Sequence, residues 1–237
     1  VVGFLDGFGF LELVPYGLIL LLIVGLMMLE PHMSGTILIL AGAAAVLFAA
    51  GIKLYWFAGG GAALMGLVVL MMSGYQSTRI LVWQDPWAYP RDGGYQIIQS
   101  LYAIGSGGLL GLGLGKSRQK FLYLPEPEND FIFAIVCEEL GLIGAGIVLI
   151  LFALLVMRGY WIAIHARDRF GALLVVGITT LTAVQVFLNI SVVTNLIPTT
   201  GISLPFFSYG GTALMIQLAE MGIILSVSRQ IPAPRQE

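Results

Sequence analysis

Asp130 is an acidic residue at the junction between a polar, glycine-rich loop and a long apolar segment. The loop ends with Glu128 and Asn129, and the apolar segment opens with Phe131-Ile132-Phe133. If the apolar segment crosses a membrane, Asp130 lies where water meets hydrocarbon. Ionisable groups at membrane depth cost about 2.5–3.5 kcal/mol at a helix centre, so they are functional candidates by default. Asp130 is therefore our candidate for acid–base chemistry on a lipid-linked, phosphate-bearing substrate.

Two opposing effects act on this carboxylate. The apolar residues that follow Asp130 disfavour its charged form, whereas the cations Lys116, Arg118 and Lys120 upstream favour it. A carboxylate balanced between these effects can accept a proton near neutral pH. The alternative is an aspartate that caps the amino end of a helix, and the sequence is compatible with both interpretations.

The three cations alternate along the chain at positions 116, 118 and 120. In an extended segment their side chains all point the same way, because the side chains of a strand alternate between two faces. Three cations on one face beside a membrane suit a pyrophosphate or a lipid phosphate. Ordinary snorkelling of basic side chains toward lipid headgroups explains the pattern equally well.

Further acidic residues lie on both sides of Asp130. Glu126 and Glu128 continue its alternation upstream, which is typical of a solvated acidic turn. Glu138 and Glu139 lie further along the apolar segment, and at 1.5 Å per residue Glu138 is about 12 Å from Asp130, too far to share a proton. We expect Glu138 and Glu139 to pair with a neighbouring helix in a structural role.

Polar residues also occur within two later apolar segments. Thr182, Gln185 and Asn189 are spaced three and four apart and form one stripe on a helix. Hydrogen bonding between helices explains the stripe, and a water-lined groove explains it too. Glu220 lies near the middle of the last apolar segment, where an acid favours a functional role.

The composition of the chain places these residues in a membrane protein. Of the 237 residues, 58% are hydrophobic and 10% are charged, whereas a soluble domain carries about 25% charged residues. The net charge of −2 gives no indication of a nucleic-acid partner. The single cysteine, Cys137, excludes a disulfide framework, and because His32 and His165 lie far apart in sequence we expect no zinc site.

Apolar runs of about 20 residues, the length that crosses a bilayer, predict about six transmembrane helices. Together they form an all-α polytopic membrane protein with one domain over residues 1–237. A turn at 51–53 separates the second span from the third, because one helix of their combined length would be about twice as long as the bilayer is thick. The expected spans are 13–29, 34–51, 54–73, 130–157, 170–192 and 209–228.

Basic residues predict the orientation, because short cytoplasmic loops carry an excess of Lys and Arg. One set of segment ends holds six basic residues, whereas the short loops 30–34 and 193–208 hold none. The long 74–129 loop holds five, but long loops obey the rule poorly. Both ends of the chain are then cytoplasmic, and the 74–129 and 193–208 loops are external. The basic residues that decide this are Lys53, Arg158, Arg167, Arg169, Arg229 and Arg235.

The large external loop, 74–129, contains an apolar section over 94–114 that is interrupted by several glycines. This section is too short and too rich in glycine for a full span. We expect an interfacial or re-entrant half-helix followed by a flexible crossing, because non-helical backbone at membrane depth needs protein or a watery cavity around it. The 198–211 stretch has the same polar, glycine-containing character and no charge.

Several long motifs can be recognised together. They are Glu30-Pro31-His32 with Gly35-Thr36, Gly94-Tyr95-Gln96, Gln99-Ser100, Ala103-Ile104-Gly105-Ser106-Gly107-Gly108, Gly113-Leu114-Gly115-Lys116-Ser117, Gln119-Lys120, Tyr123-Leu124-Pro125-Glu126, Asp130-Phe131-Ile132-Phe133-Ala134, Glu138-Glu139-Leu140-Gly141 and the run from Pro198 to Gly211. These motifs cover nearly the whole chain and resemble the SEDS family, many members of which carry Asp where His32 stands. The stretch from Ser117 to Pro125 is closer to FtsW and SpoVE than to RodA.

The SEDS family comprises the bacterial FtsW, RodA and SpoVE proteins, which are peptidoglycan glycosyltransferases. The resemblance implies an enzyme of the bacterial plasma membrane that polymerises lipid II during cell division. The partners that it implies are a class B penicillin-binding protein, other division proteins and membrane lipid. Family members have more membrane helices than this chain, so we expect the chain to supply the carboxy-terminal part of the fold and to lack the first helices.

By position, Asp130 matches the essential external-loop aspartate of the family, the proposed catalytic base. The resemblance implies that Asp130 deprotonates the sugar 4-hydroxyl of the acceptor lipid II, and that undecaprenyl pyrophosphate leaves from the growing glycan with inversion. A divalent cation, Mg²⁺ or Mn²⁺, would be held mainly by the phosphates and not by a metal site of the protein. Candidate residues for the pyrophosphate and sugar are Arg79, Gln99, Ser100, Lys116, Ser117, Arg118, Gln119, Lys120, Glu126, Ser208 and Tyr209.

Two other functions are compatible with the sequence. Polar stripes beside broken helices also suit a lipid II flippase, which would depend most on mid-membrane groups such as Glu220. A non-catalytic scaffold that recruits a penicillin-binding protein is the other alternative. A polymerase is distinguished from both by its dependence on Asp130.

Overall fold

The structure is a computed structural model that describes residues 10–29, 33–53, 59–61, 74–91, 93–122 and 129–231. All regular secondary structure within these residues is helical. Glu126 and Arg235 lie outside the described residues, as does most of the expected third span, 54–73.

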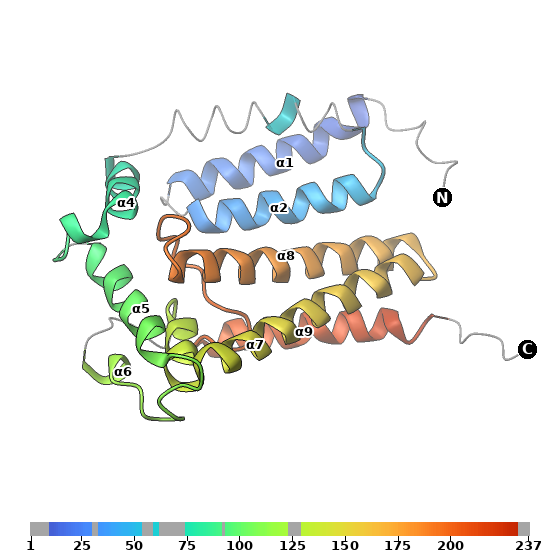
Figure 1. Ribbon diagram of the computed structural model, residues 1–237. Coiled ribbons are helices and arrows are strands. Elements are labelled where there is room, and N and C mark those ends of the chain that lie inside the picture. Colours follow the sequence, from blue (N-terminus) through green and yellow to red (C-terminus); the bar gives the residue numbers. More distant parts are fainter. Residues whose placement is uncertain are drawn as a thin grey trace, which may run out of the picture.

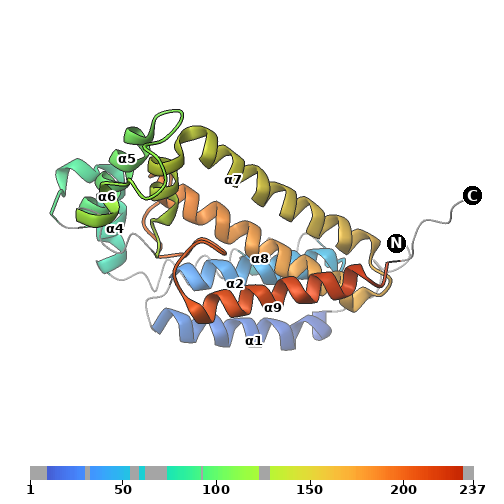
Figure 2. The ribbon, with the colours of Figure 1, turned by 90° about the horizontal axis from the view of Figure 1, so that it is seen from below.

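Five long helices form the body of the molecule, and α8 lies at its centre (Figure 1). One side of α8 packs against α2 and the other side against α7, while α9 contacts both α7 and α8 and α1 packs on α2. Figure 2 shows the same arrangement from below, with α7 and α1 on opposite sides of the bundle. The helices are α1 (Phe10–Leu29), α2 (Met33–Ala49), α7 (Ile132–His165), α8 (Arg169–Val193) and α9 (Gly211–Ser228).

The outer faces of these helices are apolar. Within the described residues, α7, α8 and α9 are long and apolar enough to cross a membrane, and α1 and α2 contain shorter apolar stretches over Val14–Met27 and Ser34–Ala49. Large aliphatic side chains such as Leu22, Leu142 and Leu151 are exposed on the surface. A helix satisfies its backbone hydrogen bonds internally, which is what a segment in hydrocarbon requires. The prediction of an all-α, multi-pass membrane protein is confirmed.

The helix bounds agree with the predicted spans except at the carboxyl end of α7. This helix continues to His165, whereas the sequence predicted an end near residue 157. Arg158 does not interrupt it, because the guanidinium lies over the Trp161 ring three residues later, 4.1 Å from the ring centroid. The following turn is short, and the Asp168 carboxylate accepts the Gly171 N–H at 2.7 Å and so caps α8. The expected total of six spans stays a prediction.

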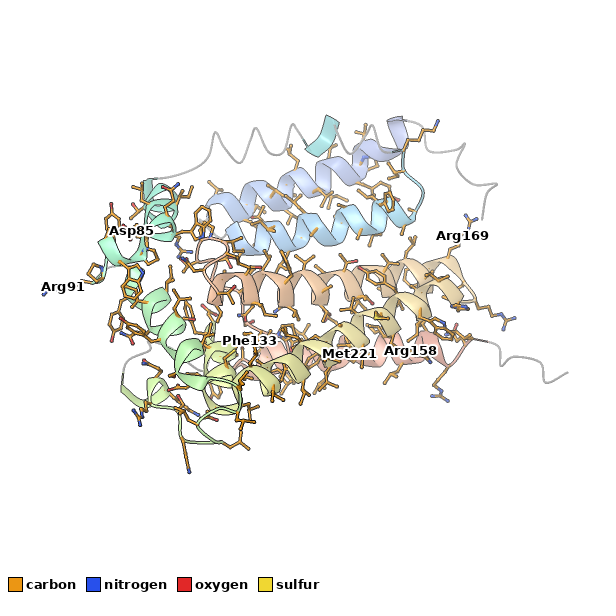
Figure 3. All side chains as sticks on the ribbon, in the orientation of Figure 1. Asp85, Arg91, Phe133, Arg158, Arg169 and Met221 are labelled. Atoms are coloured by element: carbon orange, nitrogen blue, oxygen red, sulfur yellow. The ribbon has the colours of Figure 1, made fainter. Side chains whose placement is uncertain are left out.

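The two ends of the bundle differ in what they carry. The carboxyl end of α2, the turn between α7 and α8 and the carboxyl end of α9 lie together at one end (Figure 1). This is the end of Arg158 and Arg169, whereas Asp85 and Arg91 lie at the opposite end (Figure 3). The latter end also holds four shorter helices, α4 (Gly74–Gln84), η2 (Pro86–Ala88), α5 (Gly94–Gly107) and α6 (Gln119–Leu122).

Helix α5 is the half-helix expected within 94–114, and it packs against α7. It ends at Gly107, and the chain then runs as irregular backbone through Gly111 and Gly113. Whether this segment re-enters a membrane stays a prediction.

Helix α7 is interrupted at Gly141, which has φ 67° and ψ −171°. In an uninterrupted helix, the Leu142 and Ile143 N–H groups would donate to the carbonyls of Glu138 and Glu139. Here these donors and acceptors bond to the 107–113 segment, which runs across the interruption. The bonds are Leu142 N to Gly108 O at 2.9 Å, Ile143 N to Leu109 O at 3.2 Å, Leu112 N to Glu138 O at 2.9 Å and Gly113 N to Glu139 O at 2.9 Å.

Glycines make this close approach of two backbones possible. A Cβ at Gly107 would overlap the Cys137 carbonyl oxygen, and a Cβ at Gly111 would overlap the Glu139 carbonyl oxygen. The backbone groups left unpaired by the break in α7 are thereby satisfied by the crossing segment, as buried peptide groups must be. The glycine-rich stretch is therefore anchored to α7 rather than being a free crossing.

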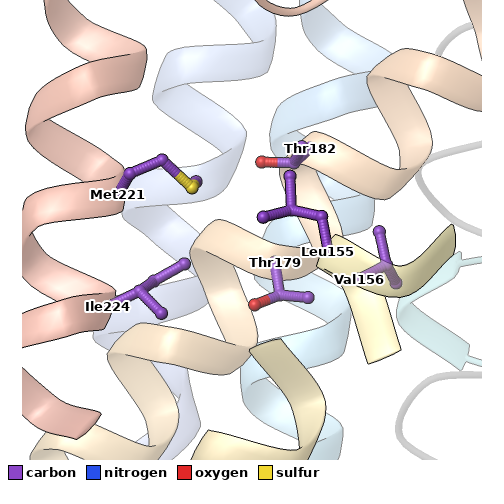
Figure 4. A pocket seen from close by; sticks show the side chains of 6 residues that line it. All are labelled: Leu155, Val156, Thr179, Thr182, Met221 and Ile224. Carbon is purple, nitrogen blue, oxygen red and sulfur yellow. The ribbon is translucent and has the colours of Figure 1, made fainter. Parts of the chain in front are cut away.

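A small residue also sets the distance between α7 and α8. Gly159 of α7 faces Thr179 of α8, and a Cβ at Gly159 would overlap the Thr179 side chain. Small residues let membrane helices approach closely and pack. Nearby, α7, α8 and α9 leave a cavity with room for about one water molecule (Figure 4). Its lining residues are Leu155, Val156, Thr179, Thr182, Met221 and Ile224.

Gly159→Ala is therefore expected to destabilise the α7–α8 packing by about 1–3 kcal/mol, the usual range for an overpacked core. The measurement is the thermal unfolding midpoint of the purified protein in detergent. The matched control is Gly222→Ala in α9, where a Cβ meets nothing within 4 Å. A Gly159→Ala midpoint equal to that of the control would contradict the role of this contact.

Candidate active site

Asp130 lies in the turn that leads into α7, with its side chain half-buried. The residue that flanks the first turn of α7 is Phe131, and no side chain caps the helix there. Asp130 lies one residue before this cap position, and the capping interpretation stays a prediction beside the catalytic one.

Side chains from α8 and from the 198–208 loop hold the backbone around Asp130. The Asn189 amide nitrogen donates to the Asp130 carbonyl at 2.8 Å and to the Ile202 carbonyl at 2.7 Å. The Ser208 hydroxyl donates to the Asn129 carbonyl at 2.6 Å and accepts the Leu204 N–H at 2.7 Å. Since Asn189 is 1% exposed, its two hydrogen bonds form away from water, where the low dielectric makes them stronger. The turn at Asp130 and the 198–208 loop are thus fixed to each other.

The 198–208 loop passes beside the Asp130 carboxylate at Gly201. A Cβ at Gly201, which has φ 74°, would lie 3.6 Å from the Asp130 Oδ2 atom. Any larger residue at 201 would be strained in the left-handed region and would extend beside the carboxylate. Gly201 therefore leaves space next to the candidate base.

This loop is also held by helices from several parts of the chain. The Ser34 hydroxyl of α2 donates to the Thr200 carbonyl. The Arg79 guanidinium of α4 donates to the Thr199 carbonyl at 2.8 Å, and the Phe206 N–H donates to the Gln217 side chain of α9 at 2.8 Å. Arg79, a predicted substrate residue, thus contacts the loop that passes beside Asp130.

Two residues of the polar stripe on α8, Gln185 and Asn189, bond to this loop. The Gln185 side chain donates to the Ser203 carbonyl at 3.0 Å, and Asn189 bonds as described above. The Thr182 hydroxyl donates to the Ile178 carbonyl of its own helix at 3.0 Å. The expectation of interhelical bonding is corrected, because residues at the carboxyl end of α8 lie beside a loop that returns over them.

The cationic segment has a different conformation from the one that the sequence suggested. Its last part, Gln119–Leu122, forms the short helix α6, so the alternating extended arrangement of the three cations is wrong. Lys116 and Arg118 are exposed, and Lys120 is half-buried. The Gln119 side chain is half-buried, with its amide oxygen enclosed in the protein and without a hydrogen-bond partner within the described residues.

Glu138 pairs with this cationic segment and not with a helix. Its Oε2 atom accepts the Ser117 hydroxyl at 2.5 Å, and its Oε1 atom accepts the Arg118 N–H at 3.1 Å. The expected structural role of Glu138 fits this placement, but its partner was predicted wrongly. Glu139, the next residue, is half-buried, and its main-chain carbonyl accepts the Gly113 N–H of the 107–113 segment.

The remaining predicted residues are not gathered at one point. Ser100 is fully buried and donates to the Val193 carbonyl at 2.8 Å, a placement that suits the core and not a substrate ligand. Gln99 is half-buried on α5, and Tyr209 is 79% exposed. Glu220 is half-buried on α9. Sequence reasoning missed Ser34 and Gln217, which gave no signal beyond being polar residues at helix positions.

Within the described residues, no three side chains of His, Cys, Asp or Glu come close enough to hold a metal ion. This donor set does not fit a divalent cation resident in the protein.

Comparisons with known proteins agree with one another. A family profile described as "Cell cycle protein", which covers FtsW, RodA and SpoVE, matches residues 9–232. Stage V sporulation protein E of Bacillus subtilis is 50% identical over 206 residues, which are 86% of this chain and 56% of that protein. A protein of Geobacter sp. (strain M18), named probable peptidoglycan glycosyltransferase FtsW, is 44% identical over 219 residues, covering 92% of this chain and 60% of that protein. The chain thus spans well under two thirds of the length of these relatives.

Solved structures show the same relationship. A chain from a peptidoglycan synthase complex, described as coordinating polymerization and crosslinking, matches with a TM-score of 0.74 and 30% identity, over 94% of this chain and 63% of that one. The rod shape determining protein RodA of Thermus thermophilus matches with a TM-score of 0.59 and 29% identity, over 92% of this chain and 56% of that one. Since the profile covers nearly all of the chain and the relatives share its sequence and its fold, the chain belongs to the FtsW/RodA/SpoVE family, the SEDS proteins.

Proposed function

We propose that this chain carries the catalytic part of a peptidoglycan glycosyltransferase that polymerises lipid II, with Asp130 as the general base. The observation that carries the proposal is the setting of Asp130. Its main chain is held by Asn189, its side chain is half-buried, and Gly201 leaves space beside the carboxylate. A base held in place next to open space can take a proton from a bound hydroxyl.

In the proposed reaction, Asp130 removes the proton from the 4-hydroxyl of the acceptor sugar. The freed oxygen attacks the anomeric carbon of the growing glycan, and the bond between that carbon and the diphosphate oxygen breaks. Undecaprenyl diphosphate leaves with the electron pair of this bond, and attack from the opposite face inverts the anomeric carbon. The proton then passes from Asp130 to water.

The leaving diphosphate needs positive charge. Lys116 and Arg118 are exposed on the segment before α6, and Lys120 follows in α6. Cations placed where negative charge develops stabilise the transition state. A Mg²⁺ or Mn²⁺ ion carried by the phosphates of the substrate would add to this charge.

We also propose the outward orientation and the partner. The end of the bundle that holds Arg158 and Arg169 faces the cytoplasm. Asp130 and the 74–129 segment then face outward, where lipid II is used. A class B penicillin-binding protein is the proposed partner. The likeness to a chain from a peptidoglycan synthase complex supports this partner.

Polymerisation of lipid II tests the function directly. A form of the protein extended to the full length of its curated relatives is purified with a penicillin-binding partner and incubated with fluorescent lipid II and Mg²⁺. Glycan chains on a gel are expected. Binding of the partner without any glycan product would favour a scaffold and overturn the enzymatic proposal.

Glu220→Gln separates polymerisation from transport. A flippase depends on ionisable groups within the membrane, whereas polymerisation at the outer surface does not need Glu220. We expect the variant to retain glycan formation within about threefold of the unmodified protein. Lipid II translocation is measured in parallel in proteoliposomes. Loss of both translocation and glycan formation in this variant would favour the transport function.

A further inference from the structure

Glu138 is a buried acid on an apolar helix, and its carboxylate is bonded to the cationic segment. The residue is 1% exposed. Its Oε2 atom accepts the Ser117 hydroxyl at 2.5 Å and the Gln119 N–H at 3.4 Å, and its Oε1 atom accepts the Arg118 N–H at 3.1 Å. A buried carboxylate is tolerated when donors satisfy its oxygens, and here the donors come from consecutive residues of one segment.

The hydrogen bonds continue from Ser117 into α6. The Ser117 hydroxyl oxygen, in a side chain that is 3% exposed, accepts the Lys120 N–H at 3.0 Å. The acceptor and donor residues are three apart, so this bond joins Ser117 to the first turn of α6, which begins at Gln119. The carboxylate of Glu138 thus orients the Ser117 hydroxyl and fixes the backbone from 117 to 120.

Glu138 also holds the start of the same segment through its main chain. Its carbonyl oxygen, which is left without a partner within α7 by the break at Gly141, accepts the Leu112 N–H at 2.9 Å. Residues 112 and 117 are therefore both attached to one residue of α7, by backbone at one end and by side chain at the other. Lys116 lies between these two attachments, and Arg118 follows directly after the second.

Glu138 therefore fixes the backbone that carries the exposed side chains of Lys116 and Arg118. We propose that Glu138 is a positioning residue that fixes Lys116 and Arg118 for binding the diphosphate of a prenyl-linked substrate. This proposal rests on the proposed function, because the diphosphate is the leaving group of that reaction. Glu138 does not touch the ligand, since its carboxylate is buried and its oxygens are already bonded to the segment.

Glu138→Gln tests this role with almost no change in size. A glutamine has one acceptor oxygen and one donor nitrogen, so either the Arg118 N–H or the Ser117 hydroxyl faces a donor in place of an acceptor. We expect the KM for lipid II to rise about tenfold and kcat to fall by no more than about threefold, because cations held beside the diphosphate bind it before the reaction as well as in the transition state. Glu139→Gln is the matched control on the next residue, and its KM is expected to be unchanged.

Binding is also measured without turnover. Fluorescent farnesyl diphosphate is titrated into the Asp130→Asn protein in nanodiscs, with and without the added Glu138→Gln or Ser117→Ala substitution. Both additions are expected to weaken binding, Glu138→Gln by about tenfold and Ser117→Ala by less. If farnesyl diphosphate binding depends on Glu138 in this way but the protein with Asp130 intact makes no glycan, the proposed reaction fails while the role of Glu138 stands.

Two results would overturn the role of Glu138. One is unchanged farnesyl diphosphate binding in both Glu138→Gln and Ser117→Ala; because Ser117→Ala removes only a hydroxyl, this result stays informative even if Glu138→Gln does not fold. The other concerns lipid headgroups. If nanodiscs rich in phosphatidylglycerol displaced bound farnesyl diphosphate equally from the proteins with and without Glu138→Gln, Lys116 and Arg118 would be assigned to lipid headgroups.

Discussion

Asp130→Asn is expected to lower glycan formation from lipid II by at least about a hundredfold, the smaller end of the usual contribution of a general base. Asparagine keeps the shape of the side chain but cannot accept the proton of the sugar hydroxyl. The Asn189 bond to the main-chain carbonyl of residue 130 does not involve the substituted atoms, so the turn is expected to keep its shape. The measurement is the single-turnover rate of polymerisation, with expression and partner binding checked by copurification.

Asp85→Asn is the matched control for this substitution. Asp85 lies at the same end of the bundle in an exposed turn, where its carboxylate accepts the Trp87 and Ala88 N–H groups. Asparagine can accept both bonds, so activity is expected to be unchanged. If Asp130→Asn made normal glycan, Asp130 would not be the base, and if both variants lost activity equally, the loss would not be specific to Asp130.

Gly141→Ala is expected to cost about 3 kcal/mol or more in stability. The φ and ψ values of Gly141 lie in a region essentially restricted to glycine, where another residue is strained by about 1–3 kcal/mol. A Cβ at this position would also overlap the Gly111 nitrogen, which belongs to backbone and cannot rotate away. Relief of the overlap requires the crossing segment to move, and the four bonds across the break would be lost with it.

The measurement for Gly141→Ala is the yield of monodisperse protein in detergent and its unfolding midpoint. Gly146→Ala is the control on the same helix, because a Cβ there meets nothing within 4 Å. This control is expected to match or slightly exceed the unmodified protein, since alanine favours a helix by about 1 kcal/mol over glycine. Equal stability of the two variants would mean that the break in α7 is not needed for the fold.

The apolar helices could be predicted because long hydrophobic runs carry a strong signal. The end of α7 was missed because Arg158 looked like a loop residue, whereas its guanidinium lies over Trp161 and lets the helix continue. The break at Gly141 was also missed, since a single glycine in an apolar run is tolerated in many helices. What distinguishes Gly141 is its contact with Gly111, which lies far away in sequence.

The candidate site could be predicted only in part, for a similar reason. Asp130 was selected from the change of polarity at its position, and its role as the base stays a prediction. The partners of Glu138 and Asn189 were not predicted, because spacing along one helix says which residues share a face and nothing about which loop returns to meet them. Ser100 illustrates the same limit, since a motif residue that looked available for substrate is buried under the end of α8.

The backbone exchange between residues 107–113 and α7 has a consequence for how the protein is made. The donor and acceptor groups that complete α7 come from a segment that precedes it in the chain. During synthesis from the amino end, this segment has already left the ribosome when residues 138–143 emerge. Helix α7 can therefore enter the bilayer with the N–H and carbonyl groups at its break already hydrogen-bonded. If synthesis began at residue 132, the same groups would reach the insertion machinery without partners.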